Sequence, residues 1–527
     1  FAKNERMKKR FNITGTCYPH KHYMMDTSKK LEQIMELVEY GDYFTINRPR
    51  QYGKTTALFR MVDKLKANPE YLPIKLNFQG IDEAWHVSDG AFAKMFISKI
   101  EEALRLSIPR LSTFLTEHKQ KVENMDSLSL LITNFVNQTD KKIVLLIDEV
   151  DASSNYEPFL KLLATLRTKY LARESPEHAT FHSIVLAGVH DIKSLKFNLR
   201  NPNDAQYNSP WNIAIEFKVR MSFNAQEIVP MLEEYGQEEN VSMDFSAIAE
   251  RLYYHTSGYP FLVSKLCKNI VEDILPYKKQ SDNWILEDVE AAVQQLLKEN
   301  NTNFDSLIKN LENNPDLSDV VTHILINGGT VSFNQHNPVI AKGVLYGVFK
   351  RNGHVKIHNR IYEQIIYNYI TSKILTDNLE HFTLGGHFIQ KDGSLDMRAV
   401  LLKFQQFMKE QYSKKKGLLS EYSGRKLFLA FLSPILNGQG HAFREVETSE
   451  EKRMDIVITY LQFRYIIELK RWNGQKYHEK GLVQLADYLD IHGVEKGYLV
   501  VFDEREKREW RSEDERIDGK EIFGVWV

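Results

Sequence analysis

Residues 41–65, GDYFTINRPRQYGKTTALFRMVDKL, run from an apolar strand through a tight turn into an amphipathic helix. The turn closes on Gly53, Lys54, Thr55 and Thr56. Backbone N–H groups in such a turn, together with a helix N-terminus, form a nest that holds phosphate groups. Lys54 would reach the β- and γ-phosphates of a nucleotide, and the Thr55 hydroxyl would ligate Mg²⁺. The stretch therefore predicts an α/β fold built around a nucleotide-binding loop.

The loop departs from the usual Walker A pattern G-x-x-x-x-G-K-[ST] in one position. Arg48 stands where the first glycine is expected. A Gly-Lys-Thr tripeptide also opens ordinary helices, so the loop taken by itself leaves that alternative open.

A second segment supplies the partner that such a loop needs. KKIVLLIDEVD, residues 141–151, is a continuous apolar run that ends in Asp148 and Glu149. A run of this kind suits a parallel strand covered on both faces. It has the form of a Walker B strand, in which Asp148 would bind the Mg²⁺ of the nucleotide and Glu149 would polarise the attacking water. An ordinary core strand explains either segment but not the pair.

Two later segments extend the pattern. FHSIVLAGVHDI is another buried strand, which ends at His190 and Asp191 and has the placement of a sensor 1 strand. In HTSGYPFLVSKLC, Gly258 and Pro260 open an apolar helix of the kind found in ATPase lids.

Together these segments resemble the AAA-like ATPases of the broad STAND and AAA-ATPase-like group, over about residues 10–290. The loop RPRQYGKT looks like that group's version, which makes the absent glycine a family trait and makes Arg50 a cofactor-binding candidate. The resemblance implies ATP and Mg²⁺ as cofactors, with residues 23–26 leading toward the nucleotide base. It names no arginine finger, although Arg200 and Arg220 follow the sensor 1 strand.

The C-terminal quarter carries a different chemistry. RMDIVITYLQFRYIIELKRW, residues 453–472, predicts two adjacent strands joined by a short turn. Asp455 opens the first strand, and Glu468 and Lys470, two positions apart, share a face of the second. Two carboxylates and an ammonium group are what Mg²⁺-dependent phosphodiester hydrolysis requires.

This arrangement resembles the PD-(D/E)XK nuclease superfamily. The resemblance implies a metal site of Asp455, Glu468 and, from the preceding helix, Glu421, with Glu447 a weaker candidate. Lys470 would assist the attacking water. Glu-x-Lys tripeptides are common on protein surfaces, so the motif alone does not identify a nuclease. The interpretation depends on the order of the predicted helices and strands around it.

The helix HEKGLVQLADYL after the E-x-K motif extends the likeness. Its Gln484 and Tyr488 lie on one helix face, as in the Q-x-x-x-Y element of RecB-like members, where it lies near the substrate phosphates. The turn SEEKRMD lacks the glycine that relatives often have before the aspartate.

Composition limits the function classes. The chain has 527 residues, 43% apolar and 26% charged, and a net charge of -1, so nucleic-acid contact must come from local patches such as Lys414–Lys416 or Lys470–Trp472. Two cysteines exclude a disulfide scaffold and a cysteine-based zinc motif, and they fit a reducing, cytoplasmic setting. No apolar run is long enough to cross a membrane, and no signal peptide is expected.

The pattern predicts five consecutive parts. They are an AAA-like ATPase core (1–221), a helical lid (222–300), a winged-helix-like domain with a hairpin at Arg351–Gly353 (301–375), a linker (376–395) and a PD-(D/E)XK α/β domain (396–527). The winged helix is expected to pack rather than to bind DNA, because its hairpin carries few cations. The mixed-charge stretch DEREKREWRSEDER is expected to be a solvated helix before a final strand.

Together these expectations predict an ATP-regulated, metal-dependent nuclease that acts on nucleic acid, with DNA as the expected substrate. By analogy, the protein is expected to act in defence against foreign DNA. It is also expected to form a homo-oligomer. Two alternatives stay open. One is a STAND-like signalling switch whose nuclease fold is an inactive docking module. The other is a scaffolding ATPase that binds nucleic acid through the winged helix.

Overall fold

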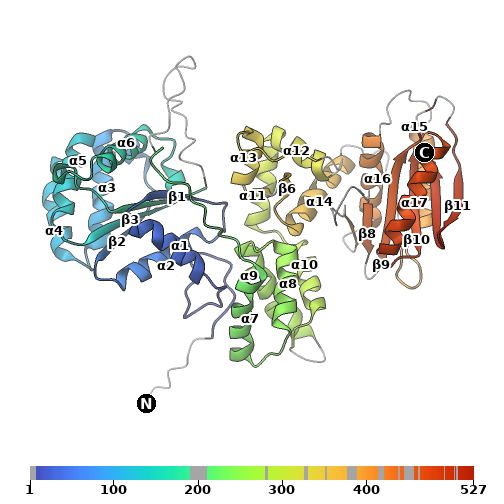
Figure 1. The fold of residues 1–527 in the computed structure, drawn as a ribbon, viewed down its shortest axis with the longest axis horizontal. Coiled ribbons are helices and arrows are strands. Elements are labelled where there is room, and N and C mark those ends of the chain that lie inside the picture. The colour runs from blue at the N-terminus through green and yellow to red at the C-terminus, as the bar shows by residue number, and fades with distance from the viewer. Residues whose placement is uncertain are drawn as a thin grey trace. The chain divides into compact units, whose positions relative to one another are not determined.

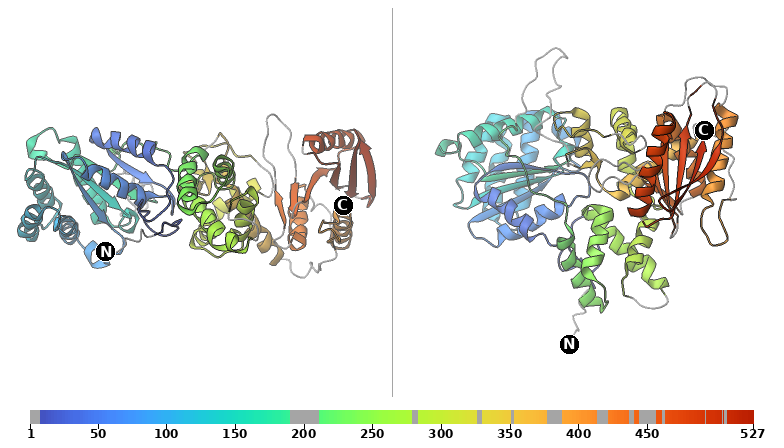
Figure 2. Two further views of the ribbon diagram at one scale, coloured as in Figure 1. Left: turned by 90° about the horizontal axis from the view of Figure 1, so that it is seen from below. Right: turned by 45° about the vertical axis from the view of Figure 1, so that its right-hand side comes forward.

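The computed structural model describes residues 8–189, 211–278, 283–325, 330–350, 353–376, 388–412, 421–436, 440–443, 456–460, 463–491, 493–503, 505 and 508–527. The chain divides into two compact units (Figures 1 and 2): Phe1–Leu296 with Ala341–Val348, and Leu297–Ile340 with Phe349–Val527.

A parallel sheet forms the centre of the first unit. Its strands lie in the order β1-β4-β3-β2, and their bounds are β1 Tyr43–Asn47, β2 Tyr71–Asn77, β3 Lys142–Asp148 and β4 Ser183–Gly188. A parallel bridge between Phe44 and Ile215 continues the sheet beyond β1. β3 and β4 are almost entirely buried, as expected of parallel strands covered on both faces. The predicted α/β class with a parallel sheet is confirmed.

Helices cover this sheet on both sides (Figure 1). α1 and α2 lie on one face, and α3, α5 and α6 lie on the other, around a core that includes Phe92, Phe96 and Phe159. Local signals start the helices: the Ser88 hydroxyl caps α3, and Asn124 and Ser127 form a capping box on α5. The bounds are α1 Ser28–Glu39, α2 Lys54–Lys66, α3 Asp89–Leu104, α4 Pro109–His118, α5 Met125–Val136 and α6 Glu157–Leu171.

Four α-helices of the described chain lie within residues 222–300, the region that is predicted to be helical. They are α7 Ala225–Glu239, α8 Phe245–Thr256, α9 Pro260–Asn269 and α10 Leu286–Leu296. Asn224 and Glu227 form a capping box on α7, and Pro260 occupies the first position of α9, where its missing N–H costs nothing.

The second unit begins with helices and a small hairpin. The elements of this region are α11 Thr302–Glu312, α12 Pro315–Leu325, β5 Phe349–Lys350, β6 Lys356–Ile357 and α14 Arg360–Thr376. Between α12 and β5 lies α13 Pro338–Leu345, whose residues from Ala341 onward belong to the first unit. The predicted hairpin is present, with Phe349 paired to Ile357 and Gly353 at φ 55°, while Arg351 and Asn352 lie outside the described residues. α13 was not predicted, and Ser332 makes an isolated antiparallel bridge to His354.

A mixed sheet organises the C-terminal part. Its order is β11-β12-β10-β9-β8-β7, with β9, β10 and β12 parallel and the other pairs antiparallel. The bounds are α15 Met397–Tyr412, α16 Glu421–Leu436, β7 Gly440–Phe443, β8 Ile456–Tyr460, β9 Phe463–Arg471, α17 Gln475–Ile491, β10 Lys496–Phe502, β11 Ser512–Ile517 and β12 Lys520–Trp526.

The helix predicted for DEREKREWRSEDER is wrong. Residues 512–517 form the edge strand β11, which pairs with β12 from Ser512↔Val525 to Ile517↔Lys520. Exposure along β11 alternates between exposed and half-buried, the period of a strand. Charged residues are common on edge strands because they discourage pairing with other chains, so the charge pattern did not identify a helix.

Candidate functional site

The predicted phosphate loop, residues 48–53, joins β1 to α2. Two of its residues have left-handed backbone conformations, Gln51 at φ 57° and Gly53 at φ 82°. Gly53 is the N-cap of α2 and offers no side chain there. Changes of backbone hand in a short loop turn successive N–H groups toward one concavity, the geometry that binds phosphate oxygens.

Lys54 begins α2 at the edge of this loop. It is 6% exposed, and its Nζ donates hydrogen bonds to the carbonyl oxygens of Arg48 and Pro49, both at 2.9 Å. Burial lowers the pKa of Lys54, and the nearby carboxylates of Glu149, Asp151 and Asp148 act in the opposite direction. The lysine therefore interacts with three acidic groups, and a bound phosphate would compete with the Arg48 and Pro49 carbonyls for its ammonium group.

The predicted Walker B residues stand at the end of β3. Asp148 is 1% exposed, pairs with Asn77 of β2 in the sheet register, and lies 4.0 Å from Lys75 Nζ. Glu149 follows in a left-handed conformation at φ 55°. Burial raises the pKa of Glu149, Asp148 adds to the rise, and Lys54 opposes it. A carboxyl group tuned in this direction can accept a proton at neutral pH.

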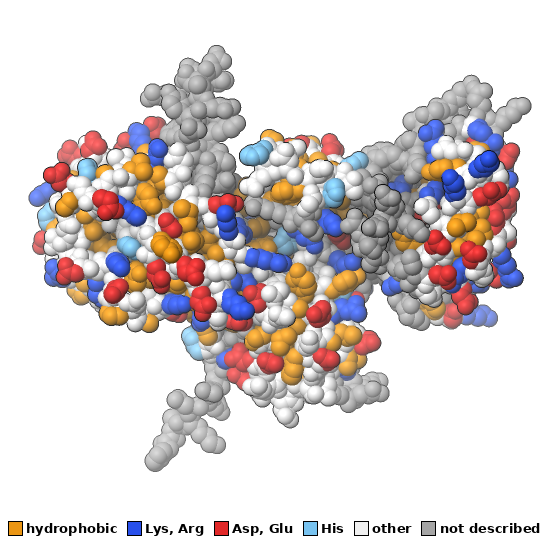
Figure 3. Space-filling model, in the orientation of Figure 1, with side chains coloured by type: hydrophobic (Ala, Val, Ile, Leu, Met, Phe, Trp, Pro, Cys, Tyr) orange, Lys and Arg blue, Asp and Glu red, His pale blue; other side chains and the backbone are white. Residues whose placement is uncertain are grey.

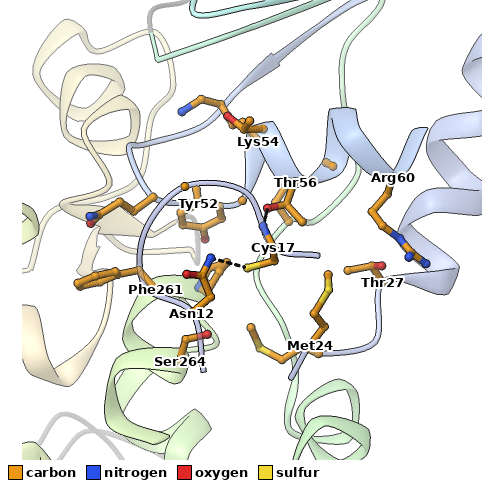
Figure 4. Close-up of a pocket in the computed structure, with 18 of the residues that line it drawn as sticks. Asn12, Cys17, Met24, Thr27, Tyr52, Lys54, Thr56, Arg60, Phe261 and Ser264 are labelled. Carbon is orange, nitrogen blue, oxygen red and sulfur yellow. Dashed lines mark hydrogen bonds between the residues drawn. The ribbon is translucent and has the colours of Figure 1, made fainter. Parts of the chain in front are cut away.

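A cavity of about 470 Å³ joins these groups to two other parts of the first unit. Figure 4 shows residues of its wall: Lys54 and Thr56 at the start of α2, Cys17 and Met24 from the N-terminal segment, and Phe261 and Ser264 from α9. The candidates on the wall are Arg50, Gly53, Lys54, Thr55, Thr56 and Glu149. Asp148 is not among the residues that line it.

The N-terminal segment closes one side of the cavity. The Cys17 N–H donates to Thr56 Oγ1 at 3.1 Å, so the Thr56 hydroxyl holds this segment (Figure 4). Asn12 Nδ2 donates to the Thr14 carbonyl at 2.8 Å and fixes the turn before it. Tyr23 lines the same wall, as do Met24 and Met25.

Several wall residues were missed by the sequence reasoning. They include Arg60 of α2, and Asn12, Phe223 and Ser264, which come from segments that are distant in the chain from the phosphate loop, so no local pattern links these three to it. Arg60 does have a recognisable position, because it lies six residues after Lys54 on the same helix.

The oxygens available suit the cation that the motif implies. Thr55 offers a hydroxyl on the cavity wall, and Asp148 and Glu149 offer carboxylates at the carboxyl end of β3. Oxygen-only donors of this kind are the ligands that Mg²⁺ prefers. Among the described residues, no group of three or more His, Cys, Asp or Glu is arranged as a complete protein metal site.

Two arginines near the loop are held away from the cavity. Arg48 donates to the carbonyls of Asn47 at 2.7 Å and Val219 at 2.9 Å, and its guanidinium lies over the Phe217 ring. Arg220 donates to Ser222 Oγ at 2.9 Å and to the Tyr253 hydroxyl at 3.2 Å. Neither residue lines the cavity. Arg200, His190 and Asp191 lie outside the described residues.

The C-terminal candidates lie in the mixed sheet. β8 and β9 form the predicted hairpin, with Ile456 paired to Ile467. Lys470 Nζ lies 2.7 Å from Glu468 Oε1, so the two side chains of the E-x-K motif form an ion pair, and Glu468 is 3% exposed. A Cβ added at Gly481 of α17 would be 3.4 Å from Lys470 Cε, so α17 covers this face.

The two flanking helices lie on opposite faces of that sheet. α17 carries Gln484, which is exposed, and Tyr488, which is half-buried, on the Glu468 face. α16 packs on the other face, where Gly424 meets Phe502. α16 begins at Glu421, whose side-chain direction lies outside the description.

Two further candidates of this domain, Asp455 and Glu447, also lie outside the described residues. The same holds for Lys414–Lys416. No helix in the described part of the chain is both long enough and apolar enough to cross a bilayer.

Comparison with known structures gives distant likenesses. A Walker-type ATPase of Pyrococcus abyssi is 13% identical and has a TM-score of 0.46, with 68% of this chain and 99% of that chain covered. The Aeropyrum pernix ORC2 protein is 13% identical with a TM-score of 0.39 (70% and 99% covered), and the Thermotoga maritima RuvB branch migration motor is 14% identical with a TM-score of 0.33 (68% and 96% covered). At these values the likenesses carry no argument about function.

No curated protein matches the chain. A family model described as an AAA-like domain matches residues 18–368, which is more than half of the sequence. The chain therefore belongs to the AAA-like domain family.

Proposed function

We propose that the chain binds ATP with Mg²⁺ in the cavity at the phosphate loop and hydrolyses it. The observation that carries this proposal is that Arg50, Gly53–Thr56, Glu149 and residues of α9 line one cavity. The phosphate-binding loop, the cations Arg50 and Lys54, the Thr55 hydroxyl that would bind the metal ion, and Glu149 as the proposed general base therefore lie together. All of them belong to the region that the family model matches.

Each residue has a separate task in this reaction. The N–H groups of Gly53–Thr56 and the ammonium of Lys54 hold the phosphates. Thr55 and Asp148 would hold Mg²⁺, which neutralises charge on the β- and γ-phosphates when bound. Glu149 orients the attacking water and accepts its proton, a role that fits its raised pKa.

The C-terminal domain is proposed to hydrolyse phosphodiester bonds, with DNA as the expected substrate. The support is the order helix, three strands, helix, strand from α16 to β10, together with the Glu468–Lys470 pair under α17. Asp455, Glu468 and Glu421 would hold one or two Mg²⁺, with Gln484 and Tyr488 near the phosphates. ATP would regulate this cutting. We further propose that the protein acts in defence against foreign DNA, as a homo-oligomer in the cytoplasm.

The surface constrains how nucleic acid would bind. On the face of the first unit seen in Figure 3, Lys and Arg side chains are interspersed with Asp and Glu. Contact with phosphates would therefore rest on local groups such as Lys470 and Arg471 at the end of β9. The region 301–375 is proposed as a winged-helix-like packing module.

The first experiment measures cutting of plasmid and linear DNA with Mg²⁺ or Mn²⁺, with and without ATP. Lys470→Ala is expected to abolish metal-dependent cutting and to leave ATP turnover intact. Lys54→Ala is expected to abolish ATP turnover. No cutting of DNA or RNA by the wild-type protein under any of these conditions would contradict the nuclease proposal.

The alternatives predict other patterns in the same assays. An ATP-dependent signalling switch would keep its function in Lys470→Ala and lose it in Lys54→Ala. A scaffolding ATPase would show salt-sensitive DNA binding that Lys470→Ala leaves unchanged.

A further inference from the structure

Arg50 is the cation of the phosphate loop that the protein leaves available. It lies on the cavity wall beside Gly53–Thr56 and is exposed. Among the described residues, its guanidinium has no hydrogen bond and no ion pair, in contrast to Arg48, which is bonded to the carbonyls of Asn47 and Val219. An arginine in this position can turn toward a phosphate without breaking a hydrogen bond or an ion pair to the described residues.

The charge of Arg50 acts on the groups that would carry out hydrolysis. Burial raises the pKa of Glu149, and Arg50 is among the cations that oppose this rise. Burial lowers the pKa of Lys54, and Arg50 contributes in the same direction. Arg50, Lys54 and Glu149 also line the same cavity, so the guanidinium shares its wall with the lysine that would hold the γ-phosphate and the base that would activate water.

Tyr259 fixes the backbone of Arg50 from the other side. Tyr259 is 2% exposed, and its hydroxyl donates to the Arg50 carbonyl oxygen at 2.5 Å. Its ring meets the Tyr52 ring edge-on, with centroids 4.7 Å apart. Tyr259 is also the N-cap of α9, whose Pro260 lies on the cavity wall. The start of α9 therefore sets the conformation from which the Arg50 side chain extends.

The other described arginines near the cavity do not fit this position. Arg48 and Arg220 are bonded elsewhere, as shown above. Arg60 lies six residues beyond Lys54, roughly 9 Å along the axis of α2. Figure 4 places its guanidinium beside Thr27, on the side of the cavity away from Lys54.

We propose that Arg50 is an arginine finger supplied in cis, with Tyr259 as its positioning residue. This rests on the ATP hydrolysis proposed above and names the group that completes it. The water oxygen bonds to Pγ, its proton passes to Glu149, and the bond from Pγ to the β–γ bridging oxygen breaks with its electron pair leaving on ADP. Arg50 donates N–H bonds to the γ-phosphate oxygens while their charge is redistributed.

The decisive measurement compares kcat for ATP with the Kd for ATP in the full chain. Arg50→Ala should lower kcat by about 10²–10³-fold, the usual cost of one transition-state donor, while the Kd changes little. Arg50→Lys should restore only part of kcat, because an ammonium lacks the planar fork. Arg105→Ala, at an exposed position after α3, is the matched control. An unchanged kcat in Arg50→Ala would overturn the proposal.

A mixing experiment tests whether the arginine acts in cis. Lys54→Ala cannot turn over ATP but still carries Arg50, so in an assembly that shares arginines it would rescue Arg50→Ala. The proposal expects no recovery at any ratio of the two variants, and recovery would show action in trans and overturn it. If the wild-type chain itself hydrolyses no ATP, the proposed function fails first, which is a different result from an unaffected Arg50→Ala.

Tyr259→Phe tests the positioning role. It removes the hydrogen bond to the Arg50 carbonyl and keeps the ring contact with Tyr52. It should lower kcat without raising KM, and its effect should nearly vanish in an Arg50→Ala background, because residues that act as one unit are not additive. Equal losses in both backgrounds would assign Tyr259 a purely structural role.

Discussion

At the scale of single residues, the cavity and its surroundings contain strained backbone conformations and buried charged side chains, both of which are energetically unfavourable. Gln51 and Glu149 are non-glycine residues with positive φ, and both line the cavity. Each such conformation costs on the order of 1–3 kcal/mol and persists only where the surroundings enforce it. Around them, Lys54 and Asp148 are charged groups taken almost completely out of water. The fold thus holds these four residues in an arrangement that selection for folding stability alone would not produce.

Glu149→Gln should separate binding from hydrolysis. The amide keeps the size of the side chain but cannot accept a proton, so kcat for ATP should fall by about 10²–10⁴-fold while ATP still binds. Turnover can be followed by phosphate release and binding by calorimetry. Loss of ATP binding in this variant would mean that Glu149 serves the ground state and is not the base.

The acid limb of the pH profile should also report Glu149. A raised folded pKa means that the carboxylate gains its proton at a higher pH than an ordinary glutamate. The base is then lost on acidification before pH falls to the ordinary value of 4.5, so kcat/KM should decline from above that value. ATP affinity measured over the same range separates this titration from that of the nucleotide. An acid limb at or below 4.5 would contradict the assignment.

At the scale of elements, the junction between α8 and α9 places the start of α9 against the cavity. Gly258 has φ 71°, and the Phe223 N–H donates to its carbonyl oxygen at 2.9 Å. A Cβ at this position would lie 1.6 Å from the Phe223 carbonyl oxygen, so no side chain fits. Phe223 and Pro260 both line the cavity, and this close approach of two backbones sets their positions.

Gly258→Ala should therefore be much more destabilising than backbone conformation alone explains. Gly80 offers a matched control, because it has the same φ of 71° and no atom within 4 Å of an added Cβ. Gly80→Ala should cost about 1–2 kcal/mol of unfolding free energy from its backbone conformation. Gly258→Ala should cost about 3 kcal/mol or more, because the overlap must also be relieved. Urea unfolding of the two variants gives the comparison, and equal costs would contradict it.

The elements show which parts of the fold local sequence can predict. The strand, loop and helix around Lys54 were predictable because strand periodicity, glycine and helix start agree over one short stretch. β11 was missed because its charges alternate as in any exposed segment, and only its pairing with β12 decides its structure. The same limit applies to the cavity: Lys54 and Glu149 carry motifs, whereas Asn12 and Phe223 reach the wall through tertiary folding.

At the scale of the whole molecule, the chain contains two units with separate cores. The cluster around Phe92, Phe96 and Phe159 belongs to the first, and the cluster around Leu485, Leu499 and Trp526 belongs to the second. The cavity lies entirely within the first unit, whereas the Glu468–Lys470 pair lies within the second. ATP regulation of the C-terminal domain would therefore have to pass between two independently packed bodies.

Thermal unfolding of the full chain should consequently show two transitions, of which ATP with Mg²⁺ raises only one. At 100 times Kd the ligand stabilises its own unit by about 2.7 kcal/mol, which is roughly 4 °C for a body of this size. Gly258→Ala should lower that transition. Gly424→Ala, whose Cβ would lie 2.3 Å from Phe502, should lower the other. Lys54→Ala should abolish the ATP shift while both transitions remain. If ATP and both glycine variants instead shifted one common transition, the two units would unfold as one cooperative body. ATP binding would then also stabilise the C-terminal domain.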